Sequence, residues 1–308
     1  YIFLGLILIF FFSIISEKNI YKIAIVLFFV FFISMLFVPV FGVEIKGSKR
    51  WLDFPILPRF QPVEFLKPFL IVFVSLIVGS RFTSNNYFKF MLSALIVLPI
   101  LILLIIQPDI GQTLLISSVW LSLIFVSGIN LYILSFLFFS CIFILGYFVF
   151  YLPKFSYIKF RIVNFFDLSS KGNYQSQKAT DAIVDGGFFG KGIGEGTLNT
   201  KVPEAHTDYV ISVISEEFGI LFILSILIIF LIIIFKVFKK IPNVKNYSNK
   251  LILIGAILLI IFQVLIHIGV NIRILPTTGM TLPFLSYGGS SLLSCSILAG
   301  LILNLTRR

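Results

Sequence analysis

Charged residues are scarce in this chain. Asp, Glu, Lys and Arg together make up 12% of its 308 residues, whereas a soluble domain carries about a quarter. A soluble globular domain is therefore excluded. Cysteine is scarce as well: Cys141 and Cys295 both lie in apolar stretches, and their setting does not resemble a metal site.

Hydrophobic residues replace the missing charge. They form 59% of the chain, with 38 Phe and a mean hydropathy of +1.10. Apolar stretches of about 17 to 25 residues, separated by short polar breaks, are typical of membrane-spanning helices. We therefore predict an all-α, polytopic transmembrane helix bundle that forms one integral-membrane domain over residues 1–308. The nine expected spans are residues 1–16, 23–43, 63–79, 90–106, 111–127, 132–152, 209–235, 251–270 and 288–305. Because the first span is short and already apolar at Tyr1, we expect a further helix upstream of it.

The formal net charge of +11 raises the question of a nucleic-acid partner. In a membrane protein, anionic headgroups or an anionic lipid-linked ligand explain such a charge better, and we expect no nucleic-acid partner. Basic residues also indicate orientation, because short cytoplasmic loops are enriched in Lys and Arg. With segment 153–208 set aside, one set of alternate loops carries eleven basic residues and the other carries five. We expect the second set, and segment 153–208 with it, to face outward.

Segment 153–208 is predicted to be a long outer loop. It greatly exceeds a typical connection in length, which favours a functional role. Its glycine-rich part, residues 186–196, allows tight turns and close approach of a ligand. No strand precedes this part and it lacks a Walker Gly-Lys-Ser/Thr sequence, so we favour a turning segment over direct phosphate binding.

The end of that loop, Pro203 through Asp208, carries a dense cluster of polar residues. A carboxylate at the rim of a membrane helix is costly unless it has a partner or a task. Thr207 and Asp208 could cap the following helix. The neighbouring Glu204 and His206 instead favour a functional site, with Asp208 as the candidate catalytic residue and these two as candidate substrate-binding residues.

Three charged residues lie at the start of the third expected span. Glu64 and Lys67 are three positions apart and so share a helix face, and Arg59 lies just upstream. One interpretation is a structural ion pair, and the other is a binding site in which guanidinium and ammonium groups suit a pyrophosphate. Asp109 precedes the fifth span and also has two interpretations. It could cap the helix that follows, or it could contact a substrate or a metal.

The last polar cluster, residues 275–291, combines two prolines, three glycines and a run of hydroxyl groups. Irregular backbone at membrane depth is tolerated only against protein or a water-filled cavity, and Ser286 is a candidate substrate-binding residue in this segment. On the preceding helix, Gln263, His267 and Asn271 recur at four-residue spacing and share one face. That stripe predicts a hydrogen-bond network in the core.

Four segments together resemble the SEDS family of bacterial membrane proteins, the group that contains FtsW, RodA and SpoVE. The segments are residues 51–67, 107–111, 203–219 and 275–291. Most of the specificity lies in Pro-Glu-Ala-His-Thr-Asp and in Leu-Pro-x-x-Gly-x-x-Leu-Pro-x-x-Ser-Tyr-Gly-Gly-Ser-Ser. Ala205 and the sequence Thr-Leu-Pro at 281–283 are more similar to FtsW than to RodA.

The resemblance implies a ten-helix fold whose first helix this chain lacks. It also implies a peptidoglycan glycosyltransferase that polymerises lipid II, an undecaprenyl-pyrophosphate-linked disaccharide peptide, at the outer face of the bacterial cytoplasmic membrane. The expected partners are a class B penicillin-binding protein and other membrane proteins of the division or elongation machinery. No cofactor is implied, although a divalent cation such as Mg²⁺ or Mn²⁺ could assist at the pyrophosphate.

Carried over position by position, the resemblance makes Asp208 the general base of an inverting transfer from a MurNAc donor to a GlcNAc hydroxyl. Arg59 and Lys67 would stabilise the departing pyrophosphate, and Glu64 would position Lys67. The chain departs from the family pattern at Gln112, where Thr is common, and at Arg273, where Gly is usual. Two rival functions stay open: a transporter that flips lipid II across the membrane, and a noncatalytic scaffold of the division machinery.

Overall fold

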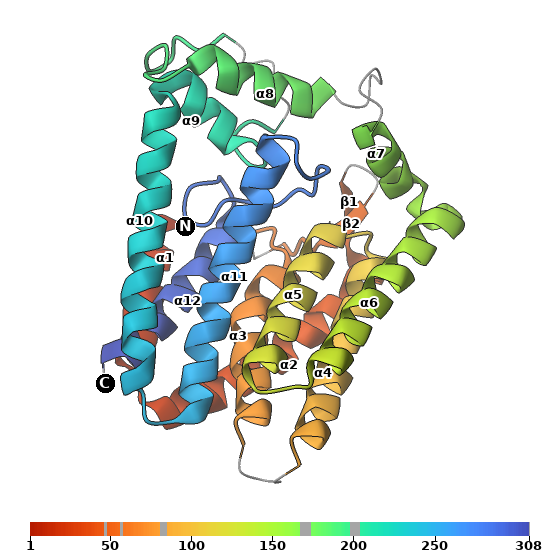
Figure 1. Ribbon diagram of the computed structural model, residues 1–308, viewed down its shortest axis with the longest axis vertical. Coiled ribbons are helices and arrows are strands. Elements are labelled where there is room, and N and C mark those ends of the chain that lie inside the picture. Colours follow the sequence, from red (N-terminus) through yellow and green to blue (C-terminus); the bar gives the residue numbers. More distant parts are fainter. Residues whose placement is uncertain (46–47, 56–57, 81–84, 167–173, 198–203, 308) are drawn as a thin grey trace. The chain divides into compact units, whose positions relative to one another are not determined.

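The computed structural model describes residues 1–307 apart from 46–47, 56–57, 81–84, 167–173 and 198–203 (Figure 1). These described residues are mostly helical, so the expected all-α membrane class is confirmed. Within them, six helices are long and apolar enough to cross a membrane. They are α2 (Glu17–Phe41), α4 (Asn86–Ile106), α6 (Leu131–Tyr151), α10 (Ile220–Lys240), α11 (Tyr247–Asn271) and α12 (Gly289–Arg307).

Over residues 153–235 the helices differ from the expected organisation in two ways. Residues 209–235 were predicted as one span, but Gly219 separates α9 (Val210–Phe218) from α10. Gly219 has a φ of +81°, a backbone conformation that is unstrained only for glycine. The predicted loop 153–208 contains the helices α7 (Ser156–Phe166) and α8 (Tyr174–Gly186), which the polar composition of this segment concealed. Pro203 of the polar cluster lies outside the described residues.

The chain forms two compact units, each assembled from separate stretches of sequence. Unit 1 comprises residues 1–137, 236–262 and 288–308, and unit 2 comprises residues 138–235 and 263–287. Each unit carries its own set of buried polar groups.

In unit 1, α3 (Pro62–Val78) is the central helix. It packs against α2, α4, α12 and α5 (Ile110–Val126), while α1 (Ile2–Ile14) packs against α12. Because α3 has neighbours on several sides, even its polar residues are buried. A β-hairpin that the sequence did not predict, β1 (Val43–Ile45) with β2 (Ser48–Trp51), follows α2 and pairs Glu44 with Lys49.

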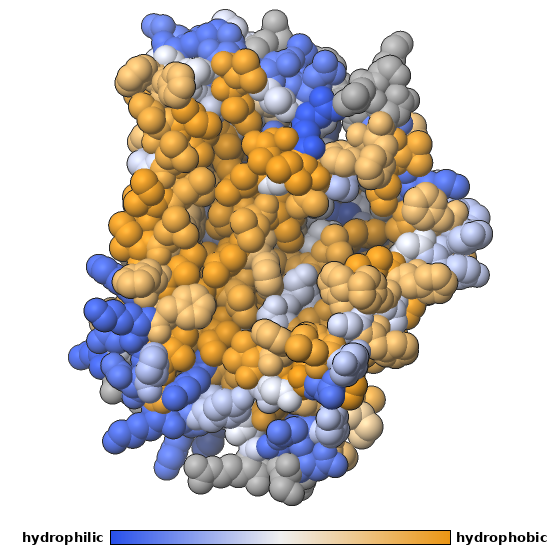
Figure 2. All heavy atoms as spheres, in the orientation of Figure 1, coloured by the Kyte–Doolittle hydropathy of each residue, from blue (hydrophilic) through white to orange (hydrophobic). Residues whose placement is uncertain are grey.

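In unit 2, α8 packs against α9 around Tyr209, which is buried with Ala179, Ala205 and Val270. The surface of α10 fits a lipid environment, because large hydrophobic side chains such as Phe222 and Ile229 are exposed along it. Figure 2 shows this hydrophobic surface along α10, with hydrophilic side chains gathered at the helix end that carries Lys239 and Lys240. The short 3-10 helices Pro153–Phe155, in unit 2, and Ile241–Asn243, in unit 1, complete the described elements.

Candidate functional site

The buried charges of unit 1 lie where α3 begins. The Nζ atom of Lys67 lies 2.9 Å from Oε2 of Glu64, and the two residues are only 1% and 5% exposed. Gln112, in the first turn of α5, donates from Nε2 to Oε1 of the same carboxylate at 2.6 Å. The ion pair expected from the i, i+3 spacing is therefore present, and its burial makes each charge depend on the other.

Asp109 acts as the cap of α5. Its carboxylate accepts from the backbone N–H of Gln112 at 3.3 Å and from Nε2 of Gln61 at 3.1 Å. Nε of Arg50, on β2, lies 3.6 Å from the same carboxylate, and this guanidinium also donates to the backbone carbonyls of residues 107 and 108. Because Asp109 is buried and engaged on several sides, the geometry favours the capping alternative over a substrate contact.

Arg59 has different surroundings from Lys67. Its side chain is 48% exposed, and Nη2 lies 2.8 Å from Oδ2 of Asp53. Within the described residues, Asp53 is its charged partner, and Arg59 contacts neither Glu64 nor Lys67. Of the three charged residues predicted to act together, the structure joins two and leaves the third at the surface.

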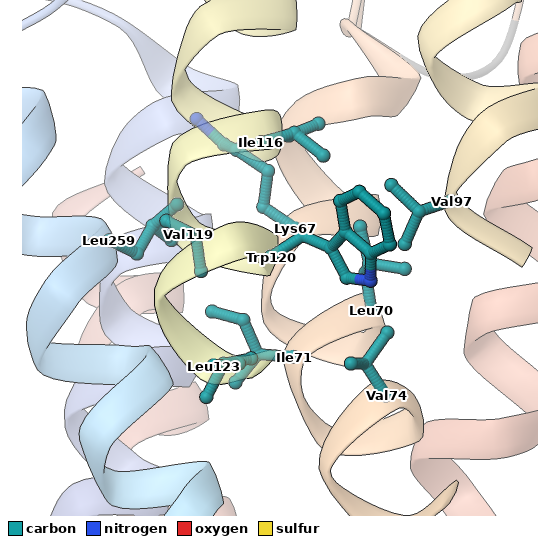
Figure 3. Close-up of a pocket in the computed structure, with 10 residues that line it drawn as sticks. All are labelled: Lys67, Leu70, Ile71, Val74, Val97, Ile116, Val119, Trp120, Leu123 and Leu259. Carbon is teal, nitrogen blue, oxygen red and sulfur yellow. The ribbon is translucent and has the colours of Figure 1, made fainter. Parts of the chain in front are cut away.

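The stem of Lys67 lines a small apolar cavity. Leu70, Val74 and Trp120 line the same cavity, and Figure 3 shows the Nζ atom of Lys67 directed away from the indole ring of Trp120. The indole N–H is satisfied by Ser93 Oγ at 3.1 Å. Apolar walls cannot solvate an ammonium group, so the charge of Lys67 is stabilised by Glu64 and not by the cavity.

In unit 2, Asp208 lies in a turn held by hydrogen bonds to its backbone. The carbonyl of Glu204 accepts from the N–H groups of residues 207, 208 and 209. Nδ2 of Asn271, at the end of α11, donates to the carbonyl of Asp208 at 3.1 Å. The N-cap position of α9 is Tyr209, and no side chain caps it. The capping alternative for Asp208 is therefore not supported, and its half-buried carboxylate is carried on a fixed backbone.

The neighbours of Asp208 divide into exposed and buried groups. Glu204 and His206 are exposed, and Oε2 of Glu204 accepts from the hydroxyl of Thr207 at 3.0 Å. Ser286 is buried: its hydroxyl donates to the carbonyl of Thr207 at 2.6 Å and accepts from the N–H of Leu282 at 2.8 Å. With both sides engaged, Ser286 fastens the turn to the backbone of Leu282, and its contact with a substrate stays a prediction.

Sequence reasoning missed Tyr209. Its ring is buried, and burial raises the pKa of its phenol, with the negative charge of Asp208 adding to the rise. The hydroxyl has no hydrogen-bond partner among the described residues. The phenol next to Asp208 in the sequence is therefore neutral and buried with Ala179, Ala205 and Val270.

The polar stripe on α11 forms the network predicted for it. Gln263 donates to the carbonyl of Thr281 at 2.9 Å, and Nδ1 of His267 lies 2.7 Å from the carbonyl of Met280. Asn271 continues the stripe to Asp208. One face of α11 therefore holds both the irregular segment near residue 280 and the turn that presents Asp208.

The glycine-rich segment turns closely around the end of α9. The N–H groups of Lys191 and Gly192 donate to the carbonyls of Glu216 and Glu217 at 2.8 and 3.1 Å. Gly190 has a φ of +77°, and a Cβ there would lie 2.2 Å from the carbonyl oxygen of Glu217. The turning-segment interpretation is confirmed. Across the described part of the chain, no three His, Cys, Asp or Glu side chains gather in a way that could hold a metal ion.

A model of the family described as "Cell cycle protein", FtsW/RodA/SpoVE, matches residues 1–308. Among curated proteins, the chain is 32% identical over 298 residues to the probable peptidoglycan glycosyltransferase FtsW of Caulobacter vibrioides, which covers 96% of this chain and 75% of that protein. It is 33% identical over 286 residues to the protein of the same description from Hydrogenovibrio crunogenus, which covers 90% of this chain and 72% of that one.

Solved structures also match over almost the whole chain. A chain from a structure described as "Structural coordination of polymerization and crosslinking by a peptidoglycan synthase complex" gives a TM-score of 0.82 at 28% identity, covering 99% of this chain and 87% of that one. The rod shape determining protein RodA of Thermus thermophilus gives a TM-score of 0.71 at 27% identity, covering 99% and 84%.

Proposed function

The chain belongs to the FtsW/RodA/SpoVE family of cell cycle proteins, and we propose that it polymerises lipid II into glycan strands with Asp208 as the general base. Its relatives are named peptidoglycan glycosyltransferases, and this chain is a peptidoglycan glycosyltransferase of the same membrane family. The curated relatives are FtsW proteins, in agreement with the FtsW-type motifs of the sequence.

The observation that carries the proposal is the presentation of Asp208. Its backbone is held by the Glu204 turn and by Asn271, so the half-buried side chain extends from a fixed point of the chain. A general base needs such a position, because proton transfer requires hydrogen-bond distance in the reacting complex.

The proposed reaction is a single inverting displacement. The 4-hydroxyl oxygen of the acceptor GlcNAc attacks the anomeric carbon of the MurNAc donor, and its proton passes to the carboxylate of Asp208. A new glycosidic C–O bond forms as the bond between the anomeric carbon and the pyrophosphate breaks. Undecaprenyl pyrophosphate leaves with the electron pair. One base is sufficient, because an α-linked donor that gives a β-linked product requires one inversion.

The remaining predicted residues receive separate roles in this proposal. Glu204 and His206 are exposed next to Asp208 and are assigned to contacts with the substrate. Arg59 is exposed and paired with Asp53, and it would exchange that carboxylate for a phosphate oxygen. Lys67 is buried against Glu64. Its charge would therefore stabilise the departing pyrophosphate electrostatically, without exposure of the ammonium group to solvent.

The proposal places the reaction at the outer face of the cytoplasmic membrane. Basic residues favour the loops opposite to segment 153–208 as cytoplasmic. One similar solved chain comes from a structure described as a peptidoglycan synthase complex that coordinates polymerization and crosslinking. That description supports a class B penicillin-binding protein, which would supply the crosslinking activity, as the partner of this chain.

The test is polymerisation of purified, labelled lipid II by the full-length protein with its penicillin-binding partner, whose transpeptidase is blocked. Asp208→Asn should lower the rate by about 10²–10⁴-fold, the usual contribution of a general base. Asp185→Asn is the matched control in the same unit, because Asp185 pairs with Lys191 at the surface, and it should polymerise as wild type does.

Each other outcome rejects a defined part of the proposal. Equal polymer from wild type and a folded Asp208→Asn protein would remove Asp208 as the base. If neither protein makes polymer, the transporter or scaffold function would be favoured over the proposed one. A transporter would then move labelled lipid II across a vesicle membrane, and a scaffold would not.

A further inference from the structure

We infer that Gln112 is a positioning residue that orients Glu64 toward Lys67, an inference that rests on the function proposed above. The two oxygens of the Glu64 carboxylate have different partners. Oε1 accepts from Nε2 of Gln112 at 2.6 Å, and Oε2 lies 2.9 Å from Nζ of Lys67. All three side chains are buried, so neither contact competes freely with bulk water.

Gln112 is itself held in place. Its backbone N–H is bound by Asp109, and that carboxylate also accepts from Gln61 and lies near Arg50. The charged groups around the Gln112 amide are therefore Glu64 and Lys67 on α3, Asp109 at the start of α5, and Arg50 on β2. Because the helix start is fixed, the amide reaches Glu64 from a defined direction.

The consequence concerns the charge of Lys67. A carboxylate without the Gln112 contact could turn both oxygens toward the ammonium and neutralise it more fully. With Oε1 engaged by the amide, Lys67 faces a single oxygen. In the part of the chain that the structure describes, Nζ of Lys67, Oε2 of Glu64 and Oε1 of Gln112 have no hydrogen-bond partner, so Lys67 and Glu64 meet as an ion pair alone. Buried polar groups seldom remain in this state without a reason, and here it preserves the positive field of Lys67 for the reaction.

The first test changes the amide to an acid of the same shape. Gln112→Glu places a second carboxylate against Glu64, whereas its protonated form, favoured at more acidic pH, can donate a hydrogen bond as the amide does. Polymerisation by the full-length protein with its partner should fall at least about tenfold at neutral pH, the scale of a hydrogen bond to a charged group. It should recover relative to wild type as the pH is lowered.

Gln112→Met is the matched control. Methionine is close to glutamine in length, and it removes the amide donor to Glu64 without adding a carboxyl group. The activity of Gln112→Met relative to wild type should therefore stay low at every pH. The same recovery in both variants, or an unchanged pH profile for Gln112→Glu, would overturn the inference.

The second test includes a measurement that does not depend on activity. Gln112→Ala and Lys67→Met are combined in a double-variant cycle read by the melting temperature of the purified protein and by the kcat of polymerisation. Because Gln112 acts through Glu64 on Lys67, the two changes should be strongly non-additive in both measurements. Additive melting temperatures would reject the coupling. Absence of polymer from wild type, with a non-additive melting cycle, would reject the proposed function and leave the positioning contact intact.

Discussion

Removing one charge of the buried Glu64–Lys67 pair should destabilise the protein far more than removing both. The pair lies in the centre of unit 1, with Lys67 1% exposed and an apolar cavity along its stem. Lys67→Met leaves the Glu64 carboxylate without its cation, and Glu64→Gln leaves the ammonium without its anion. Breaking a buried pair in this way costs about 3–5 kcal/mol.

The double variant Glu64→Gln with Lys67→Met should be more stable than either single variant. It removes both buried charges, keeps an acceptor for the Gln112 amide, and keeps the volume of the lysine stem. Neutral replacement of a buried pair often changes stability little. With a scale of about 2–4 °C per kcal/mol, each single variant should melt roughly 6–20 °C below wild type, and the double variant within a few degrees of it.

The assay is thermal unfolding of the detergent-solubilised protein, followed by the loss of monodisperse protein on size-exclusion chromatography. A double variant as unstable as the sum of the two single variants would refute the reasoning, since it would show that the charges do not depend on each other. The double variant also distinguishes the two interpretations of Glu64 and Lys67 that the sequence left open, a structural ion pair and a binding site. A folded but inactive double variant supports a role in catalysis, and an active one supports a purely structural ion pair.

Two further predictions concern unit 2. Asn271→Ala removes the hydrogen bond to the carbonyl of Asp208. Loss of a bond worth about 1 kcal/mol should lower the kcat of polymerisation several-fold with little change in KM. An equal change in kcat and KM would argue against a role for Asn271 in holding the base. Arg273 has a φ of +58°, a left-handed conformation that costs a residue with a side chain roughly 1 kcal/mol. Arg273→Gly should therefore raise the melting temperature by a few degrees. A lower melting temperature would show that the guanidinium makes a compensating interaction.

The candidate site was predictable from the sequence to the extent that it depends on local spacing. The Glu64–Lys67 contact follows from i, i+3 geometry on one helix, and the Gln263–His267–Asn271 stripe follows from i, i+4 geometry. The cap by Asp109 is equally local. Arg59 shows the limit of such reasoning, because proximity in sequence to Glu64 did not bring its guanidinium to the same buried site.

The partners that define the environment of each charge were decided by tertiary structure. Gln112 lies 48 positions from Glu64, and Asn271 lies 63 positions from Asp208. Ser286 has a hydroxyl group of the kind that binds substrates, but this hydroxyl is hydrogen-bonded to the backbone of Thr207 and Leu282. No periodicity reports such contacts, because they depend on which helix faces which.

The sequence by itself determined the membrane class, the family and most of the helices. These properties rest on composition, on the length of apolar stretches and on motifs that are read one position at a time. The tertiary structure alone decided the break at Gly219, the hairpin that holds Asp109, and the fixed turn that presents Asp208. The physical reason is that burial and hydrogen bonding are properties of surroundings, and surroundings exist only once distant segments have packed together.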